Sequence, residues 1–264
     1  MIHINFVEFE KFKKLIFDNS GIEIKKEKIF LLEARLQKRL KECKLENFSD
    51  YYRLVISDEQ ELQLMINRIT TNETSFFREN RHFDFLKKNI FPNVRTSIRI
   101  WSAAASIGLE AYTIAMLAEE FLPSSIKKYE ILATDINNEV LNQARKGVYN
   151  IKYAERIPEN YLKKYCLKGI GNMNGQFTIV NKLKQNILFQ KINLINSISP
   201  NIGDFDLIFL RNVLIYFDIP TKKKVVENVL ERLKPGGYFF VGHSESLFNI
   251  TDDLVQIAPT IYKK

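Results

Sequence analysis

The sequence predicts an α/β protein in which a small all-helical domain precedes a larger sheet domain. In the first 90 residues, apolar residues recur at the three- and four-residue steps of a helix. After about residue 98, short segments rich in β-branched and aromatic residues alternate with helix-period segments. A length of 264 residues accommodates two such domains. We therefore expect a helical domain over residues 1–80 and an α/β domain over residues 81–264.

Composition narrows the class of protein. With 45% hydrophobic and 27% charged residues, the chain resembles ordinary globular proteins. Its two cysteines, Cys43 and Cys166, lie far apart and form no metal-binding spacing, so we expect neither a metal site nor a disulfide. No apolar run approaches the roughly 18 residues of a transmembrane helix. The opening residues lack the apolar core of a signal peptide, which predicts a cytoplasmic protein.

The net charge of +8 is distributed unevenly. Residues 1–80 contain 14 basic and 14 acidic residues, whereas residues 81–264 contain 25 and 17. A basic balance suggests an acidic partner, such as nucleic acid, anionic lipid or an acidic protein surface. The alternative is that the excess of basic residues only reflects a composition rich in lysine throughout the chain. The charge alone leaves an acidic partner and this compositional explanation equally open.

Three amphipathic helices are predicted in the helical domain. The first two have apolar stripes and meet at a turn over Gly21–Ile24, and the third runs from Tyr51 to Ile69. The stripes consist of Phe6, Phe9, Phe12, Leu15 and Ile16, and of Leu32, Leu36 and Leu40. We expect the basic residues of the second helix to lie on a different face from its leucines; these residues are Lys28, Arg35, Lys38, Arg39 and Lys41. They predict a solvated face, with a docking surface for an acidic helix as the alternative.

Strands and helices alternate in the second domain, which predicts a parallel sheet with helical crossovers. The expected strands are residues 98–103, 129–135, 186–192, 205–212 and 238–243, and the expected helices are residues 108–121, 137–146 and 220–233. Leu254–Tyr262 is a candidate final edge strand. Glycines between residues 165 and 184, followed by an apolar run, predict a small β-hairpin insert.

The loop after the first strand is the first candidate site, because open α/β sheets bind ligands at the carboxyl ends of their strands. It has small residues and one glycine, Gly108, rather than the three of a pyrophosphate motif. No basic residue occurs between Trp101 and Phe121, while Glu110 lies near the helix start and Asp135 ends the second strand. These features favour a positively charged nucleoside, S-adenosylmethionine, over a dinucleotide. The alternatives are a first-turn acid for Glu110 and a helix cap for Asp135.

Two further segments have polar groups suited to a ligand. Asn72, Thr74 and Arg78 offer hydrogen-bond donors between the domains, and Arg78 could hold a carboxylate in bidentate geometry; alternatively the segment is a helix end and linker. After the fourth strand, Tyr216 is either a core aromatic or a hydroxyl that faces the reacting centre. Methyltransferases that act on exocyclic amino groups resemble one another in an Asn/Asp-Pro-Pro-Tyr motif at this place. This chain has no proline pair before Tyr216, which argues against methylation of nucleic-acid amino groups.

Residues 242–246, Gly-His-Ser-Glu-Ser, resemble a hydrolase nucleophile elbow whose last glycine is replaced. A serine hydrolase also needs a separate histidine and acid, and only His3 and His82 remain. We therefore reject a hydrolase. The preceding Pro235-Gly236-Gly237 predicts a helix stop and a turn into a strand.

Together these segments resemble the CheR-type chemotaxis receptor methyltransferases. The resemblance covers nearly the whole chain and lies in Arg35–Leu40 and in residues 71–79, 101–116, 133–137, 193–194, 210–217 and 233–247. It implies a Rossmann-like, S-adenosylmethionine-dependent methyltransferase sheet. It also implies methylation of glutamate side chains on cytoplasmic helices of chemoreceptors. The implied partner is the receptor's cytoplasmic domain; nucleic acid, membrane insertion and oligomerisation are not expected.

The resemblance also implies roles for single residues. The implied cofactor contacts are Asn72, Thr74, Arg78, Glu110, Asp135, Asn193, Leu194, Leu210 and Arg211. Arg78 and Tyr216 are the implied catalytic residues, nearest the methyl group. Ile107, Leu109 and Ala111 replace the threonine, glutamate and proline that the family usually has. The alternatives are a non-catalytic S-adenosylmethionine-binding regulator and a methyltransferase with another substrate.

Overall fold

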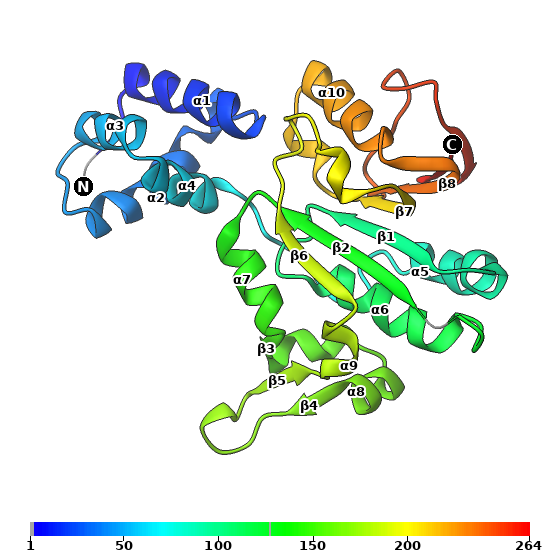
Figure 1. Ribbon diagram of the computed structural model, residues 1–264. Helices are drawn as coiled ribbons and strands as arrows, with labels where there is room; N and C mark the ends of the chain where they lie inside the picture. The colour runs from blue at the N-terminus through cyan, green and yellow to red at the C-terminus, as the bar shows by residue number, and fades with distance from the viewer. Residues whose placement is uncertain (1–2, 127) are drawn as a thin grey trace. The chain divides into compact units, whose positions relative to one another are not determined.

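The structure is a computed structural model that describes residues 3–126 and 128–264 (Figure 1). It divides into two compact units. The helical unit contains the residues up to Thr71 together with Tyr216–Lys222, and the sheet unit contains Asn72–Ile215 and Lys223–Lys264. The chain therefore passes from the first unit to the second between Thr71 and Asn72, a few residues before the predicted boundary at residue 80.

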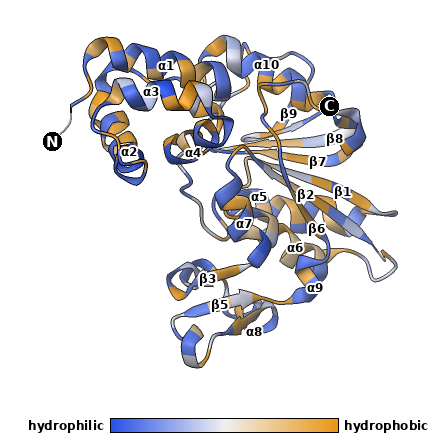
Figure 2. Ribbon diagram, turned by 60° about the vertical axis from the view of Figure 1, so that its left-hand side comes forward, coloured by the Kyte–Doolittle hydropathy of each residue, from blue (hydrophilic) through white to orange (hydrophobic). Residues whose placement is uncertain are grey.

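In its described residues, the helical unit contains α1 (Phe6–Ser20), α2 (Ile29–Glu42), α3 (Phe48–Ser57) and α4 (Glu59–Ile69), with the first residues of a later helix. Each carries both polar and apolar residues, as the mixed colours in Figure 2 show. Phe9, Phe12 and Leu36 are among its buried residues. The single helix predicted over 51–69 was wrong, because Asp58 separates α3 from α4. Its backbone is extended, and its side chain accepts hydrogen bonds from the Gln60 and Glu61 amides at the start of α4.

Arg39 of α2 lies inside the helical unit, and its predicted place on an exposed basic face was wrong. Only 8% of it is exposed. Its Nε donates to Glu61 Oε1 over 2.9 Å, and the Tyr51 hydroxyl donates to the same oxygen over 2.8 Å. The reason is helical spacing: Arg39 follows Leu32 by seven residues and Leu36 by three, so all three share one face.

The other basic residues of α2 differ in their surroundings. Arg35 is half-buried; its guanidinium donates to the Ile69 carbonyl and, over 3.0 Å, to Thr71 Oγ1. Lys28, Lys38 and Lys41 are exposed, as predicted. The exposed basic group of this segment is therefore made of lysines alone.

A seven-stranded sheet forms the sheet unit, with the strand order β6-β2-β1-β7-β8-β10-β9. The strands are β1 (Ile98–Ala103), β2 (Tyr129–Asp135), β6 (Ile187–Lys191), β7 (Phe205–Leu210), β8 (Leu233–Val241), β9 (Val255–Ala258) and β10 (Ile261–Lys263). The first five in that order pair in parallel, which confirms the predicted α/β class. The single edge strand predicted over 254–262 was wrong: it is an antiparallel hairpin, because Thr260 turns the chain in the left-handed region at φ 59°.

Helices connect and cover these strands. They are α5 (Arg81–Phe85), α6 (Leu109–Phe121), α7 (Asn138–Lys146) and α10 (Ile219–Leu230). Short 3₁₀ helices are η1 (Lys26–Lys28), η3 (Phe91–Asn93), η4 (Ile151–Arg156), η5 (Gly171–Met173), η6 (Pro200–Ile202) and η7 (Leu214–Tyr216), and η2 (Leu86–Ile90) is a π-helical turn. Helix α6 is buried along most of its length and belongs to the main core. No helix in the described part of the chain combines the length and apolarity that crossing a bilayer requires.

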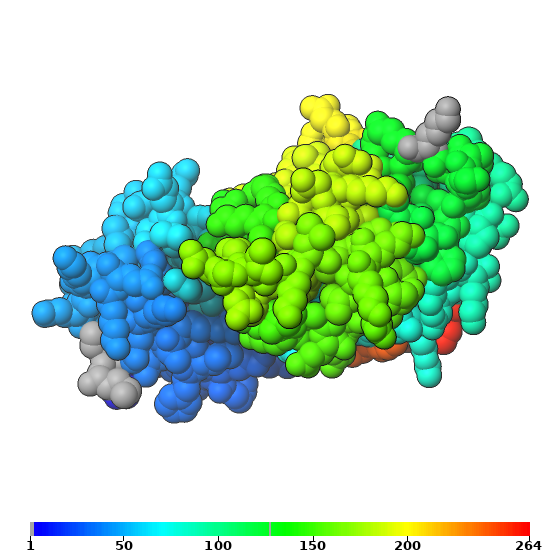
Figure 3. All heavy atoms as spheres, turned by 90° about the horizontal axis from the view of Figure 1, so that it is seen from below, coloured from blue at the N-terminus to red at the C-terminus, as the bar shows by residue number. Residues whose placement is uncertain are grey.

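The predicted hairpin insert is the larger part of a second, three-stranded antiparallel sheet. Its order is β3-β5-β4, with β3 (Val148–Asn150), β4 (Cys166–Lys168) and β5 (Gln176–Ile179), accompanied by α8 (Glu159–Tyr165) and α9 (Asn181–Lys184). The third strand, β3, lies upstream of the predicted range. Figure 3 shows atoms of this region, coloured green to yellow-green, over much of one face of the sheet unit.

The strand order positions the site. From β1 the next strands along the chain, β2 and β6, lie on one side of it, and β7 and β8 lie on the other side. The strand order therefore reverses between β1 and β7. The loops after β1, β2 and β7 follow the carboxyl ends of adjacent parallel strands. They therefore meet at one edge of the sheet, where ligands of open α/β sheets bind.

Candidate active site

An ion pair between Arg211 and Glu110 joins two of these loops. Arg211 follows β7 directly, and Glu110 lies in the first turn of α6. Arg211 Nη1 lies 2.7 Å from Glu110 Oε2, and the Ser102 hydroxyl donates to Glu110 Oε1 over 2.6 Å. The Arg211 side chain is only 2% exposed, so this pair is shielded from water on the arginine side.

The other side of the Arg211 guanidinium contacts the segment that precedes α5. Its Nη2 donates to the Arg78 carbonyl over 2.5 Å and to Glu79 Oε2 over 3.0 Å. Glu79 Oε1 accepts from the Asn212 side chain, and Oε2 also accepts from the His243 amide. Burial alone would raise the pKa of Glu79, but these hydrogen bonds and the Arg211 charge outweigh it and lower the pKa to about 2.

The loop after β1 approaches the end of β2 closely. The Ser106 amide donates to Asp135 Oδ2 over 2.9 Å, and the Asn137 amide donates to Oδ1 over the same distance. Asp135 is 8% exposed, and this burial raises the pKa of its carboxyl against the opposing backbone hydrogen bonds. Asn137, rather than Asp135, caps α7. The Asp135 carboxylate therefore fixes the loop after β1, and because the Ile136 amide also bonds to it, about one acceptor position stays unused.

Gly108 is required where this loop enters α6. Its φ is 86°, a conformation that side chains disfavour. A Cβ at this position would lie 2.8 Å from Ala144 Cβ and 3.1 Å from the Phe189 ring. The glycine thus allows the helix start to pack directly on α7 and β6.

The segment from Asn72 to Glu79 lies against the same loops. The Ser106 hydroxyl donates to the Asn72 carbonyl over 3.1 Å, and Arg78 Nη1 donates to the Glu73 carbonyl over 2.8 Å. Asn72, Thr74 and Arg78 are all half-buried. The structure thus brings this segment next to Asp135 through Ser106 and next to Glu110 through Arg211.

The remaining predicted cofactor residues follow β6 and β7. The Ile192 amide donates to the Asp135 carbonyl over 3.1 Å, which places Asn193 and Leu194 directly after a strand end beside Asp135. Leu194 is buried, and its carbonyl accepts from the Asn228 side chain. Leu210 is fully buried at the end of β7, where it pairs with Ala103 and Val241.

Tyr216 belongs to the helical unit rather than to the sheet unit that contains Arg78. Its carbonyl accepts from the Glu23 amide over 2.9 Å, and its side chain is half-buried. Burial lowers the pKa of Arg35, and interaction with Tyr216 partly offsets this shift. Within its own unit, Tyr216 is therefore near enough to Arg35 of α2 to interact with its charge.

The three departures from the family pattern all point into the core. Ile107 is 6% exposed, and Leu109 and Ala111 are fully buried. Tyr149 donates from its hydroxyl to the Ile107 carbonyl over 2.7 Å, which anchors this turn from the insert. The substitutions therefore change packing beneath the loop.

Glu79, Asn212 and Glu245 were not predicted as site residues, although each lies within a segment that the sequence singles out. Glu79, His82 and His243 also place possible metal-ligand atoms within 4.8 Å of one another. Both Glu79 oxygens, however, already accept hydrogen bonds from Arg211, Asn212 and the His243 amide. The signal available in the sequence for Glu79 was its position directly after Arg78.

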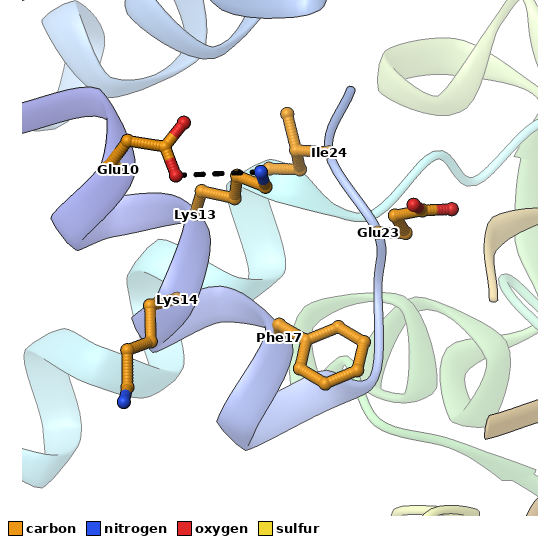
Figure 4. A pocket seen from close by; sticks show the side chains of 6 residues that line it. All are labelled: Glu10, Lys13, Lys14, Phe17, Glu23 and Ile24. Atoms are coloured by element: carbon orange, nitrogen blue, oxygen red, sulfur yellow. Dashed lines mark ion pairs between the residues drawn. The ribbon is translucent and has the colours of Figure 1, made fainter. Parts of the chain in front are cut away.

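A pocket in the helical unit lies apart from these residues in the sequence (Figure 4). It is lined by α1 and the turn after it, with Glu10, Lys13, Lys14, Phe17, Glu23 and Ile24 as lining residues. Glu10 and Lys13 form an ion pair at 3.5 Å. None of the predicted site residues lines this pocket.

Comparison with known proteins matches both units of the chain. The family model described as the CheR methyltransferase, SAM binding domain, matches residues 72–263, and the CheR methyltransferase, all-alpha domain, matches residues 7–70. The chain belongs to the CheR methyltransferase family.

Relatives of this CheR methyltransferase match over nearly their whole length. Chemotaxis protein methyltransferase of Borreliella burgdorferi is 38% identical, with 100% of this chain and 96% of the relative covered. Chemotaxis protein methyltransferase 2 of Pseudomonas aeruginosa is 36% identical, with 98% and 94% covered. The Escherichia coli chemotaxis protein methyltransferase is 34% identical, with 96% and 89% covered. Among solved structures, the glycopeptide N-methyltransferase MtfA complexed with sinefungin has a TM-score of 0.39 at 13% identity, over 66% of this chain and 52% of that one.

The chain is thus an S-adenosylmethionine-dependent methyltransferase of chemotaxis, and the residues at its sheet edge fit that cofactor. Each oxygen of Glu110 accepts one hydrogen bond, from Ser102 or Arg211, so each retains acceptor capacity for an ammonium group. Asp135 accepts from the Ser106, Ile136 and Asn137 amides, which leaves about one of its roughly four acceptor positions for a ribose hydroxyl. The loop between these carboxylates has small side chains and no basic residue.

Proposed function

We propose that this methyltransferase acts on glutamate side chains of chemoreceptor cytoplasmic helices, forming glutamate methyl esters and S-adenosylhomocysteine. Family membership supports the reaction class. The observation that carries the assignment of the site is the pair of carboxylates, Glu110 and Asp135, at the carboxyl edge of β1 and β2. The loop after β1 carries no basic residue, and although Glu110 is paired with Arg211, Asp135 is bonded by backbone amides; this edge suits a positively charged nucleoside.

The cofactor site in this proposal consists of Asn72, Thr74, Arg78, Glu110, Asp135, Asn193, Leu194, Leu210 and Arg211. Glu110 accepts from the ammonium group of the cofactor, and its ion pair with Arg211 keeps the carboxylate oriented. Asp135 accepts from the ribose hydroxyls. Asn193 and Leu194 lie beside the adenine, where the buried leucine supplies an apolar contact.

Bound S-adenosylmethionine supplies a methyl group on a positively charged sulfur. The receptor glutamate needs no general base, because its carboxylate is already ionised at pH 7. The chain's own residues therefore act by alignment and by exclusion of water. Arg78 orients a carboxylate at the reacting centre, and Tyr216 borders the path of the methyl group.

The exposed lysines on α2 and at its N-cap are the proposed docking surface for an acidic receptor helix. Lys28, Lys38 and Lys41 project to solvent, and the exposed Phe30 and Leu31 of the same helix add apolar area. Arg39 is excluded from this surface by its burial. We expect Lys38→Glu with Lys41→Glu to raise KM for the receptor and to leave cofactor affinity unchanged. An unchanged receptor KM assigns these lysines to a solvated face.

The experiment that tests the function uses radiolabelled S-adenosylmethionine, the purified protein and a receptor cytoplasmic fragment. Label released by base as volatile methanol, and only when receptor is present, identifies a receptor carboxyl methyltransferase. Label that forms without receptor identifies a different substrate class. Cofactor binding without any transfer identifies a binding regulator. We expect the first outcome, from a monomeric cytoplasmic enzyme.

A further inference from the structure

The segment Gly242–Ser246, whose sequence resembles a hydrolase elbow, packs against the turn after β7. Gly242 lies so close to Asn212 that a Cβ there would be 2.5 Å from Asn212 Nδ2 and 2.9 Å from its backbone nitrogen. Only glycine permits this approach without displacing the turn. The first residue of the segment is therefore explained by contact with Asn212 rather than by a nucleophile.

Glu245 connects the two loops directly. Its Oε2 accepts from the Gly242 amide over 2.6 Å and from the Asn212 amide over 2.8 Å. The residue is 6% exposed, and its Oε1 makes no hydrogen bond of good geometry among the described residues. Burial raises the pKa of its carboxyl, against the Gly242, Asn212, Leu214 and Ile215 amides, which favour the charged form. Burying a carboxylate with one oxygen poorly hydrogen-bonded is unfavourable. The carboxylate is held in this place by backbone amides from the two loops that it joins.

Asn212 binds carboxylates from two different segments, one through its backbone and one through its side chain. Its amide donates to Glu245, and its side chain donates to Glu79 Oε1 over 3.0 Å. Its backbone is in the left-handed region at φ 58°, which asparagine tolerates better than most residues. The hydrogen bonds to Glu245 and Glu79 thus hold Asn212 in an unfavourable backbone conformation, and this conformation sets the direction in which the chain leaves β7.

We propose that Glu245 is a positioning residue that fixes the turn after β7 through Asn212 and thereby orients Arg211 toward Glu110. The inference rests on the proposed function in one respect, namely the assignment of Arg211 to the cofactor site. Glu79 completes the arrangement, since it accepts from both Arg211 and Asn212. The three segments around residues 79, 211 and 245 thus form one support for the site.

The test compares Glu245→Ala with Glu245→Gln. The glutamine oxygen can still accept from both amides, so Glu245→Gln is expected to stay within about threefold of wild type in kcat/KM. Glu245→Ala is expected to lower kcat/KM at least about tenfold and to weaken S-adenosylhomocysteine binding about fivefold, while amide exchange at Asn212 speeds up about tenfold. Val229→Ala, a cavity variant in α10, is the control for lost stability; it should retain exchange protection at Asn212.

A second pair of variants isolates the backbone requirement. Asn212→Gly and Asn212→Ala both remove the contact with Glu79, but only glycine tolerates the left-handed turn. We expect the glycine variant to bind S-adenosylhomocysteine at least about threefold more tightly than the alanine variant. Equal affinities would overturn the inference, as would normal exchange at Asn212 in Glu245→Ala. Amide exchange at Asn212 and S-adenosylhomocysteine binding test the role of Glu245 even when no receptor is methylated. Failure of the proposed function is therefore distinguishable from failure of this inference.

Discussion

Arg211 Nη1 and Glu110 Oε2 lie 2.7 Å apart and join the turn after β7 to the first turn of α6. The pair links residues that are far apart in the sequence at the point where the strand order reverses. Because the Arg211 side chain is 2% exposed, its charge is poorly solvated and depends on Glu110 and Glu79 for compensation. The orientation of Glu110 is therefore built into the fold.

Removing the Glu110 charge should weaken cofactor binding. A hydrogen bond to a charged group contributes about 1.5–3 kcal/mol, so Glu110→Gln is expected to raise the Kd for S-adenosylhomocysteine by roughly ten- to a hundredfold. Isothermal titration calorimetry measures this directly. The matched control is Glu231→Gln, at an exposed position, which should bind as wild type does. An unchanged Kd for Glu110→Gln would remove Glu110 from the site.

Loss of the Arg78 side chain should stop turnover. We expect Arg78→Ala to reduce kcat/KM by at least about a thousandfold, about 4 kcal/mol of transition-state stabilisation, because alignment is the main contribution available to this reaction. The receptor methylation assay measures it. Arg95→Ala, an exposed arginine of the same unit, should be fully active. Near-normal kcat/KM for Arg78→Ala contradicts the catalytic assignment.

Arg39 should matter for stability rather than for docking. Breaking a buried ion pair by removing one partner costs about 3–5 kcal/mol, so Arg39→Ala should lower the free energy of unfolding by that order. Lys41→Ala, on the exposed side of α2, should change it by less than about 0.5 kcal/mol. Urea denaturation distinguishes the two. A stable Arg39→Ala variant with a raised receptor KM would restore the docking interpretation.

His82 predicts a pH dependence of stability. Burial, followed by the charges of Arg211 and His243, lowers its pKa to about 3, against the opposing effect of Glu79. The unfolded state, with a histidine pKa of about 6.5, therefore binds an extra proton between about pH 6.5 and pH 3. Unfolding free energy from this residue should fall by up to about 1.4 kcal/mol per pH unit as pH decreases through that window.

The variant His82→Gln tests this slope, because glutamine can keep a hydrogen bond to Thr260 and does not titrate. The free energy of unfolding, measured by urea denaturation between pH 4 and 7, should fall more steeply with decreasing pH for wild type than for the variant. The difference in stability between the two proteins should therefore shrink as the pH falls. Glu79, with its lowered pKa, contributes its own loss at lower pH, between about 4.5 and 2. Parallel curves over pH 4–7 would show that His82 is not kept neutral by its surroundings.

Gly108→Ala should destabilise the protein more than Gly171→Ala does. Both glycines have positive φ, but a Cβ at Gly108 meets Ala144 at 2.8 Å, whereas nothing lies within 4 Å of one at Gly171. The strain common to both is about 1 kcal/mol, and overpacking adds about 1–3 kcal/mol at Gly108. Thermal unfolding measures the difference. Equal Tm values would mean that α7 yields to the added methyl group.

Much of the sheet was predictable because its signals are local. Five parallel strands were placed from short apolar runs, and Gly108 was recognised from the turn between β1 and α6. Asp58, by contrast, interrupts a continuous helical period, and its capping role depends on its own extended backbone. The hairpin of β9 and β10 likewise depends on one left-handed residue, Thr260. Single-residue backbone choices of this kind leave little trace in a periodic pattern.

The sequence by itself determined the order of the strands along the chain, the apolar faces and the motifs that identify a CheR methyltransferase. Only the tertiary structure decided which charges lie inside. Arg39 is buried because Glu61, from another helix, supplies its counter-charge, and Arg211 is buried because Glu79 and Glu110 converge on it. A charged side chain is buried only where partners from other elements meet it. That condition is a property of the assembled fold, and so the role of Glu245 became visible only there.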